Sequence, residues 1–225
     1  MSPRQLSFDL PSRTALGRED FFVSPANAHA VAMVETWQSW PGRKLALIGP
    51  SGAGKTHLAH VWAAAARAQV VPASALARLD IPTLAQGNVA VEDVPVIAGD
   101  AASEVALFHL HNLALAEGHS LLMTAHLAPS RWGLVLPDLK SRVEGTAAVI
   151  VETPDDDLLA AVLMKLFSDR QLSPTPETIP FLLRRIDRSF DMARQVVAAL
   201  DDAALAQGRE INRKLAGEVL DGLMR

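Results

Sequence analysis

Cysteine is absent from this chain of 225 residues, and no excess of basic charge is present. The lack of cysteine excludes disulfides and thiolate metal sites, which fits a reducing compartment. The net charge is −4 and the pI is about 6.0, whereas a protein that mainly coats phosphate backbones is normally basic. We therefore do not expect DNA binding as the chief activity, and expect any contact with DNA to be indirect.

Long apolar runs, a secretion signal and internal repeats are lacking as well. No uncharged apolar stretch is long enough to span a bilayer, and no charged segment precedes an apolar run as in a signal peptide. We therefore expect a cytoplasmic protein without membrane attachment. With 49% hydrophobic residues, the chain can bury one core, or a core domain and a small satellite.

Short apolar runs alternate with helical patterns in the first part of the sequence. Buried strands that alternate with helices indicate a parallel sheet covered on both faces. Helices are expected at 57–68 and 103–117. The five predicted strands are 44–48, 69–71, 89–91, 121–124 and 147–151.

After Val151 the pattern predicts helices without strands. Thr153 as the N-cap and Pro154 in the first turn predict the first helix, and Thr175 is expected to start the second. Ser189 is predicted to cap a third helix that runs to about Gln207, and a fourth covers about 212–224. These helices predict a small separate helical domain.

The segment GPSGAGKT matches the phosphate-binding pattern G-x-x-x-x-G-K-[ST] and lies between a predicted strand and a predicted helix. Its glycines allow the backbone to curl so that N–H groups point at phosphate oxygens, and the helix adds its positive dipole end. Lys55 is expected to reach the outer phosphates, and Thr56 to offer its hydroxyl to Mg²⁺. The segment predicts binding of ADP or ATP with Mg²⁺. The predicted cofactor-binding residues here are Gly49, Gly52, Ala53, Gly54, Lys55, Thr56 and His57.

Two acidic residues, Glu92 and Asp93, end the third predicted strand, where P-loop proteins carry the Walker B pair. One carboxylate would hold Mg²⁺, directly or through water, and the other would orient the attacking water. We assign Glu92 to the metal together with Thr56. The alternative interpretation is a solvated acidic turn.

Several segments resemble, in order and spacing, the AAA+ module of the bacterial replication initiator DnaA. The resemblance extends from about residue 20 to 225, and the DNA-reading helix-turn-helix domain of DnaA is not expected here. This plan is similar to that of the short DnaA relatives of the Hda type. It implies a P-loop AAA+ module with a parallel five-stranded sheet flanked by helices, followed by an all-helical lid domain. The segments are GKTHLAH at 54–60, VEDV at 91–94, LFHLHNLALAEG at 107–118, LLMTAHLAPSRW at 121–132 and LPDLKSRV at 136–143.

The segment QLSFDL near the start alternates apolar and polar side chains, as an extended strand does. By itself it is compatible with an edge strand, an apolar peg for the chain's own core, or a peptide for another protein's groove. It resembles the N-terminal peptide by which Hda-type proteins bind the DNA polymerase sliding clamp. The resemblance implies that Gln5 hydrogen-bonds in the clamp pocket, and that Leu6, Phe8 and Leu10 supply the apolar contact.

The resemblance also implies roles for individual residues around the nucleotide. Arg142, in LKSR, matches the arginine finger, which stabilises transition-state charge on a neighbour's nucleotide. Thr124 matches sensor I at the end of the fourth strand. Phe22 and Val23 match the stretch that lines the adenine pocket, and Asn27 matches a polar position in the same segment.

Two positions depart from the family pattern. Glu92 stands where the family usually has Asp, so its carboxylate is one methylene longer. Asp191 aligns with the sensor II arginine of the lid, and a carboxylate there would repel a γ-phosphate. Arg188 and Arg194 lie three residues to either side, and either could substitute. We therefore expect weak intrinsic hydrolysis and a preference for ADP.

These features predict a flexible clamp-binding tail (1–12), an α/β nucleotide-binding domain (13–153) and a helical lid domain (154–225). The implied function is negative regulation of replication initiation, the regulatory inactivation of DnaA. The protein would dock on the DNA-loaded clamp and stimulate hydrolysis of ATP bound to DnaA, while its own ATPase stays weak. Two alternatives remain: a self-hydrolysing AAA+ remodeller or loader of a replication helicase, and a non-enzymatic clamp or DnaA adaptor. A homodimer is compatible with each.

Overall fold

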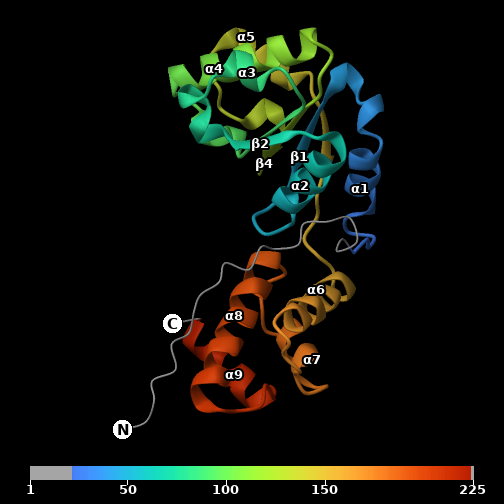
Figure 1. Ribbon diagram of the computed structural model, residues 1–225, viewed down its shortest axis with the longest axis vertical. Helices are drawn as coiled ribbons and strands as arrows, with labels where there is room; N and C mark the ends of the chain where they lie inside the picture. Colours follow the sequence, from blue (N-terminus) through green and yellow to red (C-terminus); the bar gives the residue numbers. More distant parts are fainter. Residues whose placement is uncertain (1–21, 224–225) are drawn as a thin grey trace.

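The computed structural model describes residues 22–223, which form an α/β part and an all-helical part (Figure 1). The chain passes between the two parts once, after strand β5, in the segment that leads to helix α6. The predicted clamp-binding residues Gln5, Leu6, Phe8 and Leu10 lie outside the described residues. Within the described range, no helix is both long enough and apolar enough to cross a membrane.

Five parallel strands form the sheet, in the order β2-β3-β4-β1-β5. Strand β1 therefore lies in the interior, and its Leu45 is aligned with Leu122 on one side and Ala147 on the other. The predicted parallel five-stranded sheet is confirmed. The strands are β1 (Lys44–Ile48), β2 (Gln69–Pro72), β3 (Val89–Glu92), β4 (Leu121–Ala125) and β5 (Ala147–Ile150).

Helices cover both faces of the sheet. Side chains alternate between the two faces along each strand, so these apolar strands place side chains on both faces that need to be buried. In β1, Leu45 and Leu47 pack on one face with Trp62, while Ala46 belongs to the core on the other face with Leu107. The α-helices of this part are α1 (Ala28–Glu35), α2 (Lys55–Ala66), α3 (Ile81–Leu84), α4 (Ala101–Ala116) and α5 (Pro137–Glu144). Its 3₁₀ helices are Trp37–Ser39, Pro41–Arg43, Ala73–Arg78, Val94–Ile97 and Pro129–Arg131.

The helical part has a hydrophobic core of its own, in which Leu163, Phe167 and Leu182 are buried. No strand occurs among its described residues, as predicted. Its helices are α6 (Asp156–Asp169), α7 (Thr178–Leu183), α8 (Phe190–Gln207) and α9 (Arg213–Leu223).

The starts of these helices agree only partly with the sequence signals. Ser189 is the predicted N-cap of α8, and its side chain accepts hydrogen bonds from the first turn. The predicted cap Thr153 is wrong, because Asp155 caps α6 and accepts a hydrogen bond from the N–H of Leu158 at 2.8 Å. The predicted start at Thr175 is also wrong, since α7 begins at Thr178.

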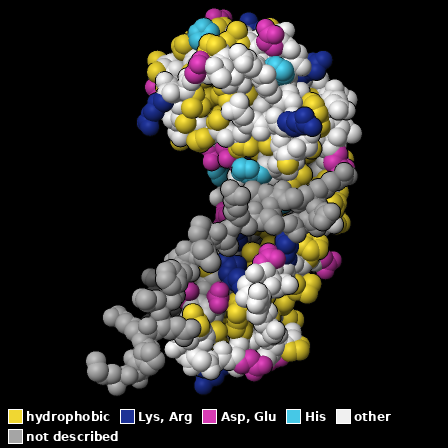
Figure 2. Space-filling model, in the orientation of Figure 1, with side chains coloured by type: hydrophobic (Ala, Val, Ile, Leu, Met, Phe, Trp, Pro, Cys, Tyr) yellow, Lys and Arg dark blue, Asp and Glu magenta, His cyan; other side chains and the backbone are white. Residues whose placement is uncertain are grey.

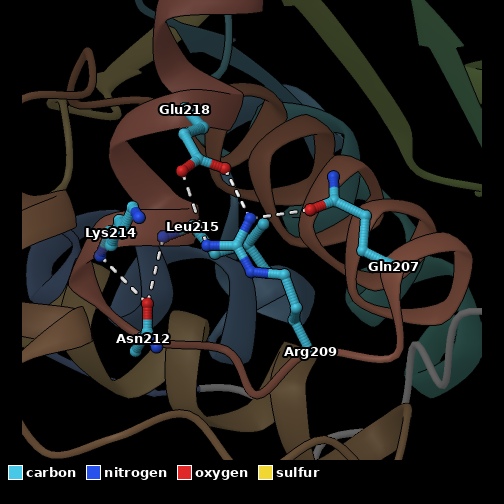
Figure 3. A network of polar contacts seen from close by, with 6 residues as sticks. All are labelled: Gln207, Arg209, Asn212, Lys214, Leu215 and Glu218. Atoms are coloured by element: carbon cyan, nitrogen blue, oxygen red, sulfur yellow. Dashed lines mark hydrogen bonds and ion pairs between the residues drawn. The ribbon is translucent and has the colours of Figure 1, made fainter.

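Polar contacts connect α8 and α9 across their turn (Figure 3). Arg209 donates to Glu218 and to Gln207 at 2.7 Å each. Asn212 caps α9, because its side-chain oxygen accepts from the N–H of Leu215 at 3.1 Å. The ion pair is exposed, and water screens the attraction between its charges, so we expect the apolar core to supply most of the stability of this part.

Candidate functional site

The phosphate loop connects β1 to α2 and is contacted by the beginning of α8. Gly52 and Gly54 have φ of +71° and +99°, which residues with a Cβ rarely adopt. The N–H of Phe190 donates to the carbonyl of Gly52 at 2.9 Å. A Cβ on Gly52 would lie 1.9 Å from the Ser189 hydroxyl, and one on Gly54 would lie 2.8 Å from the Phe190 ring. The loop therefore needs glycine for its own curvature and for its contact with α8.

A cavity of about 440 Å³ lies beside this loop, between the α/β part and helices α6 and α8. Figure 2 shows histidine and acidic side chains gathered at the indentation between the two parts. The cavity brings together many predicted residues that are far apart in the sequence. Those that line it are Phe22, Asn27, Gly52, Gly54, Lys55, Thr56, His57, Asp93, Asp191 and Arg194.

Other predicted cofactor residues lie outside the lining. Val23 is 60% exposed, whereas Ala53 is buried. Arg188 pairs with Asp156 at 2.9 Å on the first turn of α6. Among residues 22–223, the predicted positions that do not line the cavity are Val23, Gly49, Ala53, Glu92, Thr124, Arg142 and Arg188.

The Lys55 ammonium lies against the backbone of the phosphate loop. It donates to the carbonyls of Gly49 and Pro50, both at 2.8 Å. Burial lowers the pKa of Lys55, and the nearby carboxylates of Asp93 and Asp191 oppose this shift. The arrangement holds one positive charge at the phosphate loop, on the wall of the cavity.

The carboxyl ends of β3 and β4 bring Asp93 and Thr124 into contact. The N–H of Asp93 donates to the Thr124 hydroxyl at 3.0 Å, and Thr124 is 1% exposed. Asp93 has φ of +53°, so the chain turns sharply where its carboxylate meets the cavity. Thr124, predicted as sensor I, and Asp93, predicted as part of the Walker B pair, are therefore neighbours.

The metal prediction concerns Thr56 and Glu92. Thr56 lines the cavity, and Glu92 ends β3 with its Oε1 atom buried and without a hydrogen-bond partner in the described part of the chain. A buried carboxylate oxygen left unpaired is costly unless an ion or water satisfies it. Carboxylate and hydroxyl oxygens are ligands that Mg²⁺ prefers, so the residues present fit this ion.

Asp191 lines the cavity at the start of α8, and its carboxylate pairs with Arg194. Of the two arginines expected to substitute for sensor II, Arg194 lines the cavity and Arg188 does not. The carboxylate neutralises much of the positive charge that Arg194 brings. An anionic ligand therefore meets a nearly neutral pair at this wall.

Helix α6 supplies several lining residues that the sequence analysis did not assign to the site. The sequence predicted this helix, but whether a position on it faces the core or the cavity depends on packing against the other part. His126 was also missed, although it directly follows β4, at the sheet edge where ligands of parallel sheets bind. The unassigned lining residues are Ser51, His60, His126, Leu158, Val162, Lys165, Leu166, Asp169 and Phe190.

Asn27, matched to the adenine segment, has a structural contact that explains its burial. It is 5% exposed, accepts from the N–H of Ser24 and donates to the carbonyl of Phe22, both at 2.9 Å. Asn27 therefore holds the backbone of Phe22 where this aromatic residue reaches the cavity.

Arg142 lies on α5, in the last turn of the helix, and is exposed. Its guanidinium carbon is 5.4 Å from the ring centroid of Phe108. Arg142 does not line the cavity beside the phosphate loop. The predicted finger therefore lies outside the lining of the cavity in its own chain.

No protein-family model matches the sequence. The structure is similar to domain III of the replication initiation protein DnaA from Thermotoga maritima, with a TM-score of 0.77 and 19% identity over 92% of this chain and 96% of that one. It is also similar to DnaA bound to AMPPCP and single-stranded DNA (TM-score 0.66, 19% identity), over 85% of this chain and 65% of that chain. A T. maritima RuvB variant gives a TM-score of 0.66 at 17% identity, over 88% of this chain and 68% of that one. The chain therefore has the AAA+ P-loop fold with a helical lid, in the form seen in domain III of DnaA.

Proposed function

We propose that this protein is a nucleotide-binding regulator of replication initiation that acts on DnaA. In this proposal, residues 1–12 form a tail that docks on the DNA-loaded sliding clamp through Gln5, Leu6, Phe8 and Leu10. Residues 13–153 and 154–225 form the nucleotide-binding domain and its lid. Arg142 then stimulates hydrolysis of the ATP bound to DnaA, and the DnaA–ADP that remains no longer initiates.

The position of Arg142 carries this proposal. The side chain is exposed on α5 and lies outside the lining of its own cavity, so it is free to act on a nucleotide held by another protein. A guanidinium stays charged at every physiological pH and presents several N–H donors in one plane. These properties suit the charge that develops on phosphate oxygens during hydrolysis. The likeness of the fold to DnaA supports a partner of the same kind.

The test measures hydrolysis of ATP pre-bound to DnaA, with free clamp and with clamp loaded on DNA. The wild-type protein is expected to accelerate hydrolysis with the loaded clamp. Arg142→Ala should remove the acceleration, which for arginine fingers is about 10³ to 10⁵. Deleting residues 1–10 should remove the dependence on the clamp. Arg78→Ala, an exposed arginine outside α5, is the matched control and should act like wild type.

The outcomes separate this proposal from its alternatives. If wild-type protein leaves the hydrolysis rate unchanged, the finger and clamp proposal is wrong. An effect on DnaA that survives Arg142→Ala would instead favour the adaptor. Rapid ATP hydrolysis by this protein alone would favour the remodeller or loader.

The cavity beside the phosphate loop is proposed to hold ADP in preference to ATP, with Lys55 and the loop at the phosphates. When Mg²⁺ accompanies the nucleotide, Thr56 and Glu92 would hold it, and it would offset phosphate charge. Asp191 supports the preference, because its carboxylate lines the cavity where an additional phosphate charge would be repelled. Arg194 pairs with this carboxylate and offsets part of the repulsion, but it leaves no free positive charge at this wall to attract an additional phosphate.

Dissociation constants for ADP and ATP measure this preference. Asp191→Asn is expected to raise the affinity for ATP relative to ADP by about tenfold, about 1.4 kcal/mol, because a partly exposed charge is screened by water. Asp202→Asn, on the exposed face of the same helix, should leave the ratio unchanged. Clearly tighter binding of ATP than of ADP by the wild-type protein would contradict the preference.

A further inference from the structure

Helix α5, which carries the exposed Arg142, is short and is contacted by a charged side chain at each end. Its eight residues follow Leu136 and end at Glu144. One of the two side chains comes from α4, which lies next to α5 (Figure 1). The other comes from the first residue of β1. Neither residue lies near α5 in the sequence, and neither lines the nucleotide cavity.

Glu104 of α4 holds the N-terminal end of α5. It is completely buried, and its carboxylate accepts the N–H of Leu136 at 2.7 Å and that of Val135 at 3.0 and 3.1 Å. The N–H of Gly99 also donates to it, at 2.8 Å. Leu136 is the N-cap residue of α5 and has no side-chain oxygen for capping, so Glu104 holds this end through the backbone of the two residues that lead into the helix.

The charge of Glu104 suits this position. Burial by itself raises the pKa of a carboxyl, but the three backbone N–H groups stabilise the carboxylate, and the pKa of Glu104 is lowered overall. The negative charge also lies at the positive end of the α5 dipole. Glu104 therefore stays ionised while fully buried, and its hydrogen bonds to the residues that lead into α5 are charge-assisted.

Lys44 of β1 holds the C-terminal end of α5. Its ammonium donates to the carbonyl of Arg142 at 2.5 Å, in the last turn, where helix carbonyls lack partners within the helix. Nε2 of His111 lies 3.3 Å from the same ammonium, and its Nδ1 lies 3.2 Å from the side-chain oxygen of Asn112. Because that oxygen only accepts, Nδ1 carries the proton and Nε2 accepts from Lys44. The ammonium is thus directed at the backbone of the finger residue itself.

We propose that Glu104 and Lys44 are positioning residues for Arg142, holding both ends of α5 so that the guanidinium is presented in one fixed direction. Leu139 and Val143 are buried on the inner side of the helix, which leaves Arg142 on the outer side over Phe108. A site that acts on a transferring phosphate needs its charged group held to within a fraction of an ångström. This inference rests on the proposed function of Arg142 in hydrolysis.

Two variants test the two ends separately. Glu104→Gln keeps the size but replaces one acceptor oxygen by an NH₂ group that faces backbone N–H donors. Lys44→Met keeps an unbranched side chain that is one atom shorter and removes the donor at the opposite end. The test therefore does not depend on the buried Glu104 substitution alone. Glu117→Gln and Lys214→Met, both at exposed positions, are the matched controls.

Two measurements are made on each full-length variant. The rate of hydrolysis of DnaA-bound ATP is followed against protein concentration, with clamp loaded on DNA. We expect the maximal stimulated rate to fall by about tenfold to a hundredfold, while the half-saturating concentration stays within about twofold. Backbone amides of 138–144 are expected to exchange hydrogen faster than in wild type, and the controls should change neither readout.

The two readouts separate failure of this inference from failure of the proposed function. An unchanged maximal rate in both variants would overturn the positioning roles, as would an equal fall in the controls. Faster exchange without any fall in rate would overturn them too, because α5 would be loosened without effect on Arg142. If wild-type protein does not stimulate hydrolysis, the proposed function fails, and amide exchange alone decides whether the two residues hold α5.

Discussion

His111 illustrates how a single buried residue responds to its surroundings. It is 4% exposed, and its pKa is lowered from the ordinary 6.5 to about 4, mainly by burial. The hydrogen bond to Asn112 opposes this shift, and the positive charges of Lys44 and Arg142 contribute to it. His111 is therefore neutral at pH 7 in the folded protein, which lets its ring accept from Lys44.

This shift predicts a dependence of stability on pH. Between about pH 6.5 and 4, the unfolded chain binds a proton at His111 and the folded protein does not. The free energy of unfolding is therefore expected to fall as the pH decreases through this range, by up to about 1.4 kcal/mol per pH unit. Denaturant unfolding of wild type and His111→Gln at several pH values measures the difference, which should shrink toward pH 4.

The exposed His29 supplies the control for this prediction. His29→Gln should follow the wild-type pH dependence, because this side chain is exposed and lies outside the buried surroundings of His111. A difference between wild type and His111→Gln that stays constant from pH 7 to pH 4 would contradict the assignment.

At the scale of elements, the contact of α8 with the phosphate loop links the lid to the nucleotide site. Ser189 caps α8 while its side chain lies against Gly52, and the Phe190 ring lies against Gly54. The cap signal of Ser189 was visible in the sequence because capping is local. Its contact with the phosphate loop was not, because the two segments are far apart in the chain. The glycines thus allow the phosphate loop to curl and also allow the lid helix α8 to pack closely against it.

Gly52→Ala tests this contact between elements. The methyl group would collide with Ser189 and would strain a backbone at φ of +71°. Strain of about 1–3 kcal/mol is expected, and the displaced loop should weaken ADP binding by about tenfold or more. Titration with ADP measures the loss.

Gly87→Ala is the control, since a Cβ there has open space and φ is not in the left-handed region. It should bind ADP like the wild-type protein. Equal affinity for ADP in Gly52→Ala and wild type would show that the contact between α8 and the loop is dispensable for binding.

At the scale of the whole molecule, the two parts have separate hydrophobic cores with the cavity between them. Ligand that binds between two such parts contacts both, so it is expected to couple their stabilities. The tryptophans allow the two parts to be followed separately. All four belong to the α/β part: Trp37, Trp40, Trp62 and Trp132.

Thermal unfolding with and without ADP tests this coupling. Tryptophan fluorescence reports on the α/β part, whereas far-ultraviolet circular dichroism reports on both parts. We expect the two transitions to differ without nucleotide and to approach each other at higher temperature with ADP. At a free concentration of 100 times Kd, ADP should add about 2.7 kcal/mol to the free energy of unfolding. A shift of the fluorescence transition alone would contradict the coupling.

The sequence by itself determined the sheet, the phosphate loop and the number of lid helices, because strand runs, the glycine pattern and helical periodicity are local signals. It misplaced the start of α6, since Thr153 and Pro154 form a plausible cap. Tertiary contacts decided that start: the N–H of Val151 still bonds to Ile48 of β1, and Asp155 is held by the backbone of Ala26 as well as by Leu158.

Only the tertiary structure decided which charged residues act together. The sequence placed Arg188 and Arg194 equally near Asp191, but the packing of α6 against α8 pairs Arg188 with Asp156 and leaves Arg194 at the cavity. Tertiary packing likewise brought Glu104 and Lys44 to the two ends of α5, over sequence separations that no local pattern encodes. Periodicity reports on neighbours within an element, whereas the direction of a charged side chain depends on the elements that pack around it.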